Sequence, residues 1–438
     1  MNVIKSIKKL EKKTNKKVYI TSNRKNMKII GITGSRGKST TAYLVHQYLK
    51  SKGYKSALYS SIMIDSPKSK FRNYRAVENP IYDGYMLLDA IKSSLNNNCD
   101  YLILEVNERA ISQNIIDDIE FDVKLLTNII PKQNELYEDY VSLKKSFITK
   151  QDNAKKIIAV VDNDTRELYH NNSDIISVCT KHLKDTKMNS EDRIDYLLMA
   201  SDKQYSSING LDFIIKDNKK NYKLKIQSNL CMPFHGLNII CAYAVLNELN
   251  VDLNTFDEFV RTFNIPGREE TVQVGSNKIV ISPNMVPHLE NLKNYQNRHE
   301  IENIYVVLGA TGYGFNTWDQ DFFSDKYKSI HEYDIKYAYD YAIKNADKIF
   351  ITLSDNGTDN YQGLIEYQVS LAKGKIDYEV IPNRELALRT AIKQLKENDV
   401  LFVSGRGNRE VMCINKNRIA KFLDREIIEK IVKGDHHV

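Results

Sequence analysis

Residues 28–45, KIIGITGSRGKSTTAYLV, constrain the fold of this chain more than any other stretch. A short apolar run ends at Thr33, a glycine-rich loop follows, and apolar residues then continue at helical spacing to Leu49. Strand, loop and helix in this order are the context of a phosphate-binding loop, because glycines let backbone N–H groups close around a phosphate and the helix N-terminus adds partial positive charge. We predict a nucleotide site formed by Gly34, Ser35, Arg36, Gly37, Lys38, Ser39 and Thr40.

The spacing of the glycines narrows the class of loop. A strict GxxxxGK[ST] loop needs glycine at position 32, where this chain has Ile32, so the pattern is G-x-x-G-x-x-G-K-S over 31–39. Lys38 is placed to reach the outer phosphates of a nucleotide and Ser39 to ligate Mg²⁺. Glu105, near the end of the predicted buried strand 101–106, is a candidate to hold the same ion, the alternative being a solvent-facing glutamate.

Strands alternate with helices along most of the chain. The predicted strands of the first part are 28–33, 56–60, 101–106, 121–126 and 157–161, with helices at 85–95 and 140–150 and surface loops at 61–85. This alternation predicts a doubly wound, mostly parallel α/β domain, in which ligands bind at the carboxyl ends of the strands. Short runs between 194 and 229 predict a small antiparallel insert.

The alternation restarts after a linker at 265–268. Strands are predicted at 279–281, 304–308, 348–352, 378–381 and 400–403, with a clear helix at 385–395, so we expect a second, Rossmann-like α/β domain. The predicted organisation is a basic N-terminal extension at 1–27, a central ATP-binding domain at 28–265 and a C-terminal domain at 266–438.

Composition limits the partners and the compartment. The 63 basic residues are nearly offset by 56 acidic ones, so the net charge of +7 does not argue for nucleic acid, and small anionic molecules are the simpler partners. No apolar run is long enough to insert in a membrane, and no signal peptide is evident. The scattered cysteines form no CxxC pair, which disfavours a zinc ribbon or a disulfide framework and predicts a cytoplasmic location: Cys99, Cys179, Cys231, Cys241 and Cys413.

Taken together, these segments resemble the Mur ligase superfamily, whose members use ATP to join a carboxylate to an amine. The most specific match is GITGSRGKSTT at 31–41, which is similar to the family's G-x-T-G-x-x-G-K-[ST]-[ST] loop. Other similar segments of the first α/β domain are LEV at 104–106, TN at 127–128, YVSLK at 140–144, VVDND at 160–164 and GLN at 236–238. Those of the second are PGRE at 266–269, LGATG at 308–312, TLSDN at 352–356 and SGRGNRE at 404–410, which are most similar to UDP-N-acetylmuramoyl-tripeptide synthetases.

The resemblance implies a reaction and a set of roles. A substrate carboxylate attacks the γ-phosphate of ATP to give an acyl phosphate, an amine then attacks, and an amide forms with release of ADP and phosphate. Lys38 and the loop hold the phosphates, and Ser39 and Glu105 hold Mg²⁺. Lys144, beside Lys145 on a helix that would otherwise be read as solvated, matches a lysine that many members carbamylate; unmodified, its ammonium would attract the substrate carboxylate. The remaining implied contacts are Asn238 and Arg268 with nucleotide, and Asp355, Asn356, Arg406 and Glu410 with the incoming amino acid.

The chain also departs from the family. Only 27 residues precede the first strand, so we expect the N-terminal UDP-sugar-binding domain to be lacking and do not carry over its substrate. The family's D-H-x-D, whose His helps to hold a second Mg²⁺, has no counterpart at 131–135, so the resemblance leaves a second Mg²⁺ site open. D-Y-A-H is replaced by Ser-Pro-Asn-Met at 282–285, R-D-K by Phe-Asn-Thr at 315–317, and the diaminopimelate signature D-N-P-R by Asp-Asn-Gly-Thr at 355–358.

Three functions therefore remain open. The first is an ATP-dependent ligase acting on a small-molecule carboxylate and an amino acid; poly-γ-glutamate and folylpolyglutamate synthases are relatives without a comparable UDP-sugar domain. The second is a non-catalytic or partner-dependent ATP-binding subunit, which the lost family residues would suit. The third, a phosphate-loop kinase or simple NTPase, is disfavoured by the spacing over 31–39 and by the linker segment.

Overall fold

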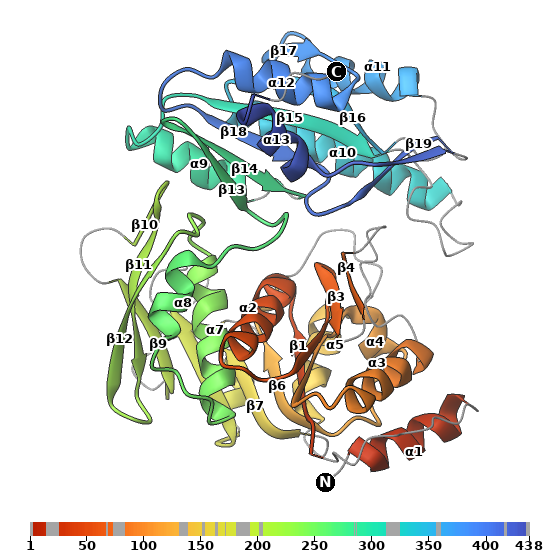
Figure 1. Ribbon diagram of the computed structural model, residues 1–438, viewed down its shortest axis with the longest axis vertical. Coiled ribbons are helices and arrows are strands. Elements are labelled where there is room, and N and C mark those ends of the chain that lie inside the picture. The colour runs from red at the N-terminus through yellow and green to blue at the C-terminus, as the bar shows by residue number, and fades with distance from the viewer. Residues whose placement is uncertain are drawn as a thin grey trace. The chain divides into compact units, whose positions relative to one another are not determined.

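The computed structural model of the chain describes residues 3–14, 26–66, 69–72, 84–130, 139–150, 154–162, 165–170, 172–180, 193–200, 205–283, 285, 287–311, 325–355, 361–415 and 418–434. It contains two compact units (Figure 1). The first consists of Met1–Phe71 and Val77–Phe263, and the second of Arg72–Ala76 and Asn264–Val438. Each unit is built on its own largely parallel sheet, as the alternation of strands and helices predicts.

The first unit is built on a sheet of twelve described strands. Its parallel centre runs in the order β9-β8-β7-β6-β1-β5-β2, and antiparallel strands continue it at both ends. The predicted antiparallel insert is therefore an extension of the main sheet, joined through β9. The strands are β1 (Lys28–Thr33), β2 (Ser56–Tyr59), β3 (Met63–Ser66), β4 (Ser69–Arg72), β5 (Tyr101–Glu105), β6 (Phe121–Leu126), β7 (Ala154–Val160), β8 (Ile175–Thr180), β9 (Tyr196–Ala200), β10 (Ser206–Ser207), β11 (Gly210–Asp217) and β12 (Tyr222–Ser228).

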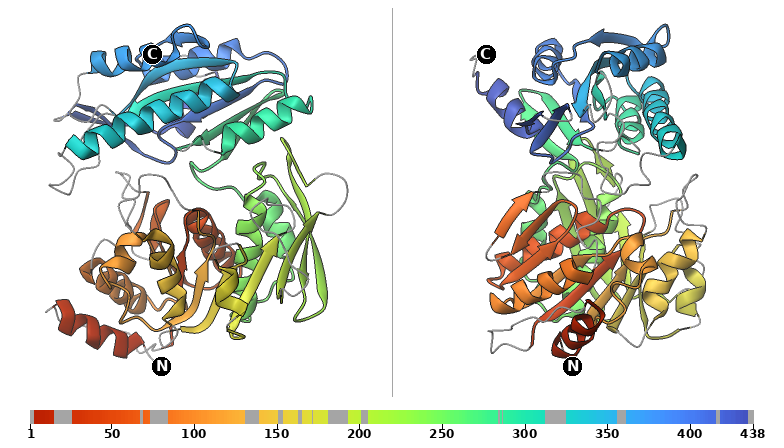
Figure 2. Two further views of the ribbon diagram at one scale, coloured as in Figure 1. Left: turned by 180° about the vertical axis from the view of Figure 1, so that it is seen from behind. Right: turned by 90° about the vertical axis from the view of Figure 1, so that its right-hand side faces the viewer.

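Helices cover both faces of this sheet, which is why its central strands are apolar on both sides. Figures 1 and 2 show α2 (Lys38–Ser51) and α7 (His235–Glu248) on one face, and α3 (Gly84–Asn96), α4 (Glu108–Ser112) and α5 (Tyr140–Thr149) on the other. The N-terminal helix α1 (Val3–Thr14) packs against α3 through the buried side chains of Ile7 and Leu10. The remaining helices of the unit are α6 (Arg166–His170) and α8 (Phe256–Thr262).

The prediction of loops throughout 61–85 is wrong for β3 and β4. β3 pairs antiparallel with β2, where Leu58 faces Asp65, so its backbone groups are satisfied in the sheet. Asp65 is buried, and its Oδ2 accepts hydrogen bonds from His46 at 3.1 Å and Lys50 at 2.9 Å. Because Asp65 is a buried polar residue, β3 lacks the run of apolar residues by which a strand is recognised in a sequence.

The second unit has a six-stranded sheet in the order β13-β14-β18-β15-β16-β17, in which β13 is antiparallel and the other strands are parallel. The helices α12 and α13 pack on one face through Leu388 and Ile428, against Ile281, Val307 and Phe350. The strands are β13 (Glu270–Val274), β14 (Asn277–Ser282), β15 (Ile304–Thr311), β16 (Lys348–Asp355), β17 (Asp377–Val380) and β18 (Val400–Ser404), with a separate hairpin of β19 (Val411–Asn415) and β20 (Arg418–Lys421). The helices are α9 (His288–Asn297), α10 (Asp325–Asn345), α11 (Tyr361–Ala372), α12 (Arg384–Gln394) and α13 (Asp424–Val432).

The two sheets bear out the predicted fold class, a doubly wound central domain followed by a Rossmann-like one. In the described part of the chain, no helix is both long enough and apolar enough to cross a membrane. Several sequence predictions concern positions beyond the described residues: Asn356, 131–135, 315–317 and 357–358.

Candidate active site

The glycine-rich loop connects the carboxyl end of β1 to the first residue of α2. Gly34 has a φ of 144°, and a Cβ added there would lie 2.0 Å from Thr127 Oγ1. Gly37, at the N-cap of α2, has a φ of 81°, and its Cβ would lie 2.2 Å from Asn238 Oδ1. A side chain is therefore excluded at both positions, by backbone conformation and by space. These glycines produce a tight turn that directs backbone N–H groups toward a ligand at the helix N-terminus.

The segment after β6 holds this turn in place. The Asn128 side chain forms two hydrogen bonds with the backbone of Arg36. Its Oδ1 accepts from Arg36 N at 2.9 Å, and its Nδ2 donates to Arg36 O at 3.2 Å. Thr127 Oγ1 donates to Arg36 O at 2.6 Å, and Ser35 N donates to Asn128 O at 3.0 Å. The Thr-Asn pair therefore has a clear structural use, which is to fix the conformation of the phosphate-binding loop.

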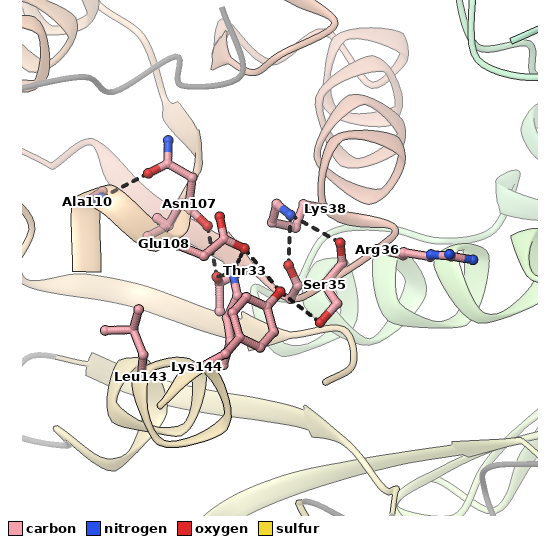
Figure 3. Close-up of polar contacts among 12 residues, drawn as sticks. Thr33, Ser35, Arg36, Lys38, Asn107, Glu108, Ala110, Leu143 and Lys144 are labelled. Atoms are coloured by element: carbon pink, nitrogen blue, oxygen red, sulfur yellow. Dashed lines mark hydrogen bonds and ion pairs between the residues drawn. The ribbon is translucent and has the colours of Figure 1, made fainter. Parts of the chain in front are cut away.

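Two cationic side chains leave this loop in different directions (Figure 3). Lys38 folds back over the turn, and its Nζ donates to Gly34 O at 2.7 Å. Arg36 is exposed and extends away from Lys38 and Ser35. Lys38 is thus already located at the loop, where a phosphate could replace its carbonyl partner, while Arg36 is oriented toward solvent.

Ser39 and Glu105 meet beside the loop. Ser39 Oγ donates to Glu105 Oε1 at 2.9 Å, and Glu105 is buried at the end of β5. Ser61 completes the group: its backbone N donates to Glu105 Oε2 at 2.7 Å, and its Oγ lies 2.8 Å from Ser39 Oγ. Ser61 was not predicted from the sequence, although it is a hydroxyl residue just beyond the end of β2, the strand that pairs with β5.

These oxygens fit one Mg²⁺ ion. A hydroxyl and a carboxylate, with the remaining positions taken by phosphate and water, are the usual protein ligands of Mg²⁺ at a phosphate-binding loop. Among the described residues there is no group of three or more His, Cys, Asp or Glu side chains able to hold a metal by themselves. Bound there, Mg²⁺ would neutralise phosphate charge, with Ser39 and Glu105 holding it and Ser61 supporting Glu105.

Lys144 is in contact with Glu108, a residue that was not predicted from the sequence. The Lys144 side chain is fully buried, and its Nζ lies 2.7 Å from Glu108 Oε1 and donates to Thr33 Oγ1 at 3.2 Å. Glu108 occupies the first turn of α4, where Asn107 caps the helix by accepting from Ala110 N at 2.8 Å. Figure 3 shows the Glu108 carboxylate between Asn107 and Lys144.

The electrostatics of Glu108 connect this group to the loop. Burial raises the pKa of the Glu108 carboxyl, but Lys38 and Lys144 lower it more strongly, and the net effect is a pKa of about 2. Tyr140 Oη lies within hydrogen-bond distance of both Glu108 Oε1, at 3.1 Å, and Ser35 Oγ, at 2.9 Å. Glu108 is therefore an anion that two lysines stabilise and that a tyrosine links to the phosphate-binding loop.

Asn238 also lies at this loop. It is buried on the first turn of α7, where its Oδ1 faces Gly37 and its Nδ2 is 3.3 Å from His235 Nδ1. The first unit thus brings together Lys38, Ser39, Glu105, Lys144 and Asn238, all predicted from the sequence, at the N-terminal end of α2.

The predicted residues of the second unit form a different kind of group. Asp355 is fully buried at the end of β16, and both of its oxygens are used: Oδ1 accepts from Arg406 at 2.9 Å and from Cys413 N at 2.8 Å, and Oδ2 accepts from Arg409 at 3.0 Å. Arg406 is also fully buried and donates to the carbonyl of Val411 at 2.9 Å. These contacts connect the end of β16 to the loop after β18 and hold that loop in one conformation.

The other two predicted residues of this unit are partly exposed. Glu410 is the last residue of the loop at 404–410, and its backbone carbonyl accepts a hydrogen bond from Phe422 N at 2.8 Å. Arg268 lies on the turn before β13, next to Gly267, which packs against the backbone of Asn408. Two segments that the sequence analysis treated separately, the linker at 266–269 and the loop at 404–410, are thus in direct contact.

Comparison with known proteins agrees with this architecture. Residues 32–246 match the Mur ligase middle domain. The UDP-N-acetylmuramoyl-L-alanyl-D-glutamate–2,6-diaminopimelate ligase of Buchnera aphidicola subsp. Baizongia pistaciae is 26% identical over 446 residues, covering 96% of this chain and 79% of that enzyme.

Two solved structures from Thermotoga maritima share the fold. Folylpolyglutamate synthase has a TM-score of 0.60 and 14% identity, covering 92% of this chain and 90% of that one. The MurF ligase, solved in complex with ADP, has a TM-score of 0.58 and 15% identity, covering 99% of this chain and 84% of that one. The fold consists of two α/β units, and the first carries a glycine-rich loop at the carboxyl edge of its sheet. The chain carries a Mur ligase middle domain at 32–246 and is similar over nearly its whole length to a ligase of the Mur superfamily, as its sequence segments indicated.

Proposed function

We propose that this chain is an ATP-dependent ligase that joins a small-molecule carboxylate to an amino acid through an acyl phosphate. The observation that carries the proposal is the meeting of Ser39 and Glu105 at 2.9 Å, directly after a glycine turn that only glycine can form. Phosphate-binding groups and an Mg²⁺-binding pair thus occupy one edge of the sheet, where a nucleotide would bind. The similarity to a UDP-N-acetylmuramoyl-L-alanyl-D-glutamate–2,6-diaminopimelate ligase over nearly the whole chain supports this reaction class.

In this proposal the chain acts mainly by positioning the substrates and by neutralising the negative charge of the phosphates. Loop amides and Lys38 bind the phosphates, Ser39 and Glu105 bind the ion that accompanies them, and Asn238 and Arg268 contact the nucleotide. Lys144 is a buried cation in contact with Thr33, directly before the loop, and would attract the carboxylate that attacks the γ-phosphate. Glu410 is the partly exposed member of the proposed amino-acid site, and Asp355 and Arg406 support the loop that carries it.

The test is product analysis with purified full-length chain, MgATP and a panel of carboxylates and amino acids. We expect ADP, phosphate and a new amide to appear together. Lys38→Ala and Glu105→Gln should abolish all three products, whereas Lys55→Ala, which removes an exposed lysine outside the loop, should not. The non-catalytic alternative predicts that ATP binds and Lys38→Ala weakens it, but that no carboxylate and amine pair yields an amide.

A further inference from the structure

The state of Lys144 separates this chain from the carbamylated members that its sequence resembles. A carbamate forms when the lone pair of a neutral lysine amine attacks CO₂; a C–N bond forms, one proton leaves, and the side chain becomes an anion. The surroundings of Lys144 are those of a cation. Its Nζ is 2.7 Å from the Glu108 carboxylate, 3.2 Å from Thr33 Oγ1 and 5.5 Å from the centre of the Tyr140 ring.

A carbamate does not fit this environment. The new anionic group would extend from a fully buried side chain toward the Glu108 carboxylate, whose Oε1 lies 2.7 Å from Lys144 Nζ. Two carboxylates in one buried site cannot both remain charged without a large cost. The ion pair with Glu108 also favours the protonated form of the lysine, and a protonated amine has no lone pair to attack CO₂.

The helix that carries Lys144 is held firmly in place. Lys124, buried in β6, donates to the carbonyls of Phe147 at 2.8 Å and Lys150 at 3.0 Å, at the C-terminal end of α5. At the other end, Asp139 accepts from Ser142 N at 2.9 Å and caps the helix. Because both ends of α5 are anchored, the short Lys144–Glu108 contact follows from the fold rather than from a freely moving side chain.

We propose that Lys144 works as an unmodified ammonium and that Glu108 is a positioning residue, which holds Lys144 and connects it to the phosphate-binding loop through Tyr140. The chemical state of Lys144 is inferred from its contacts with Glu108 and Thr33 and from the charges there, whereas its use in attracting the substrate carboxylate rests on the ligase function proposed above. Glu108 takes the place that a carbamate would need, and its negative charge lies between the two lysines that face the reacting groups.

The first test detects the carbamate without any turnover. The full-length chain is equilibrated with ¹³C-bicarbonate and examined by ¹³C NMR for a lysine carbamate signal, with the α-amino group of the chain as the internal control for carbamate formation. We expect no such signal from Lys144 in the wild type. A signal that is present in the wild type and absent in Lys144→Arg would overturn the proposal, whether or not the chain proves to be a ligase.

The second test uses the conservative variant. Arginine keeps a positive charge that can pair with Glu108 but cannot be carbamylated, so Lys144→Arg should retain measurable amide formation while Lys144→Ala loses it. Glu108→Gln should lower kcat by about 10- to 100-fold with a smaller change in the KM for ATP, because the lysine loses its position but the loop remains. Lys145→Arg, on the same helix, is the matched control. Loss of amide formation in Lys144→Arg equal to that in Lys144→Ala, together with dependence of the wild-type rate on added bicarbonate, would contradict the proposal.

Discussion

Glu108→Gln is the substitution whose effect on stability can be worked out most directly. Burial raises the pKa of the Glu108 carboxyl, and Lys38 and Lys144 more than offset this, so that it falls from the ordinary value of 4.5 to about 2. The difference, 4.5 − 2 = 2.5 pKa units, corresponds to about 3 kcal/mol in favour of the folded state when Glu108 is ionised. Glutamine has nearly the same shape and cannot carry the charge, so this stabilisation is absent from the variant.

The sign of the pH dependence follows from the direction of the shift. A carboxyl whose pKa is lower in the folded state stabilises fully above its unfolded-state pKa and loses that contribution as the pH falls from 4.5 toward 2. The difference in the free energy of unfolding between wild type and Glu108→Gln should therefore be constant from about pH 7 to about pH 5.5. At about pH 3.5 it should be smaller by about 1.4 kcal/mol.

Urea unfolding followed by circular dichroism at each pH measures this difference. The two proteins share the second unit, so its unfolding cancels in the comparison. Glu397→Gln, which changes an exposed glutamate of the second unit, is the control and should show no pH-dependent difference of this size. A wild-type advantage over Glu108→Gln that stays the same or grows as the pH falls would refute the assignment of Glu108 as an anion held by the two lysines.

Two further substitutions test other parts of the structure. Gly34→Ala places a Cβ 2.0 Å from Thr127 Oγ1 at a φ of 144°, and should cost at least about 1–3 kcal/mol of backbone strain and greatly weaken ATP binding in calorimetry. Gly53→Ala, where a Cβ meets nothing within 4 Å, should leave ATP binding unchanged. Asp355→Asn leaves two buried or partly buried arginines without their counter-ion, and should lower the unfolding free energy of the second unit by about 3–5 kcal/mol, measured by urea unfolding. An Asp355→Asn protein of unchanged stability with weakened amino-acid binding would instead support a direct role in substrate binding.

The phosphate-binding loop and the strands around it could be predicted because their signals are local. A single run of residues, 28–45, contains the apolar strand, the glycines of the turn and the start of the helix that follows. The position of Glu105 at the same edge followed from the rule that parallel strands end together, and the structure has it 2.9 Å from Ser39.

Other residues could not be assigned from local pattern, because their partners are distant in the sequence. Asp65 is buried within a strand by His46 and Lys50, so β3 did not show the expected apolar alternation. Asp355 was predicted to meet a substrate, but arginines more than 50 positions away, Arg406 and Arg409, use both of its oxygens.

The sequence by itself determined the class of fold, the glycine-rich loop and the similarity to Mur ligases, since periodicity and glycine spacing are properties of neighbouring residues. Tertiary structure alone decided which charges face one another. Glu108 and Lys144 are 36 positions apart and are brought within 2.7 Å because α4 and α5 pack on the same face of the sheet. Electrostatic energy depends on distance and burial, so the charge that the Lys144 site accepts is decided by the fold.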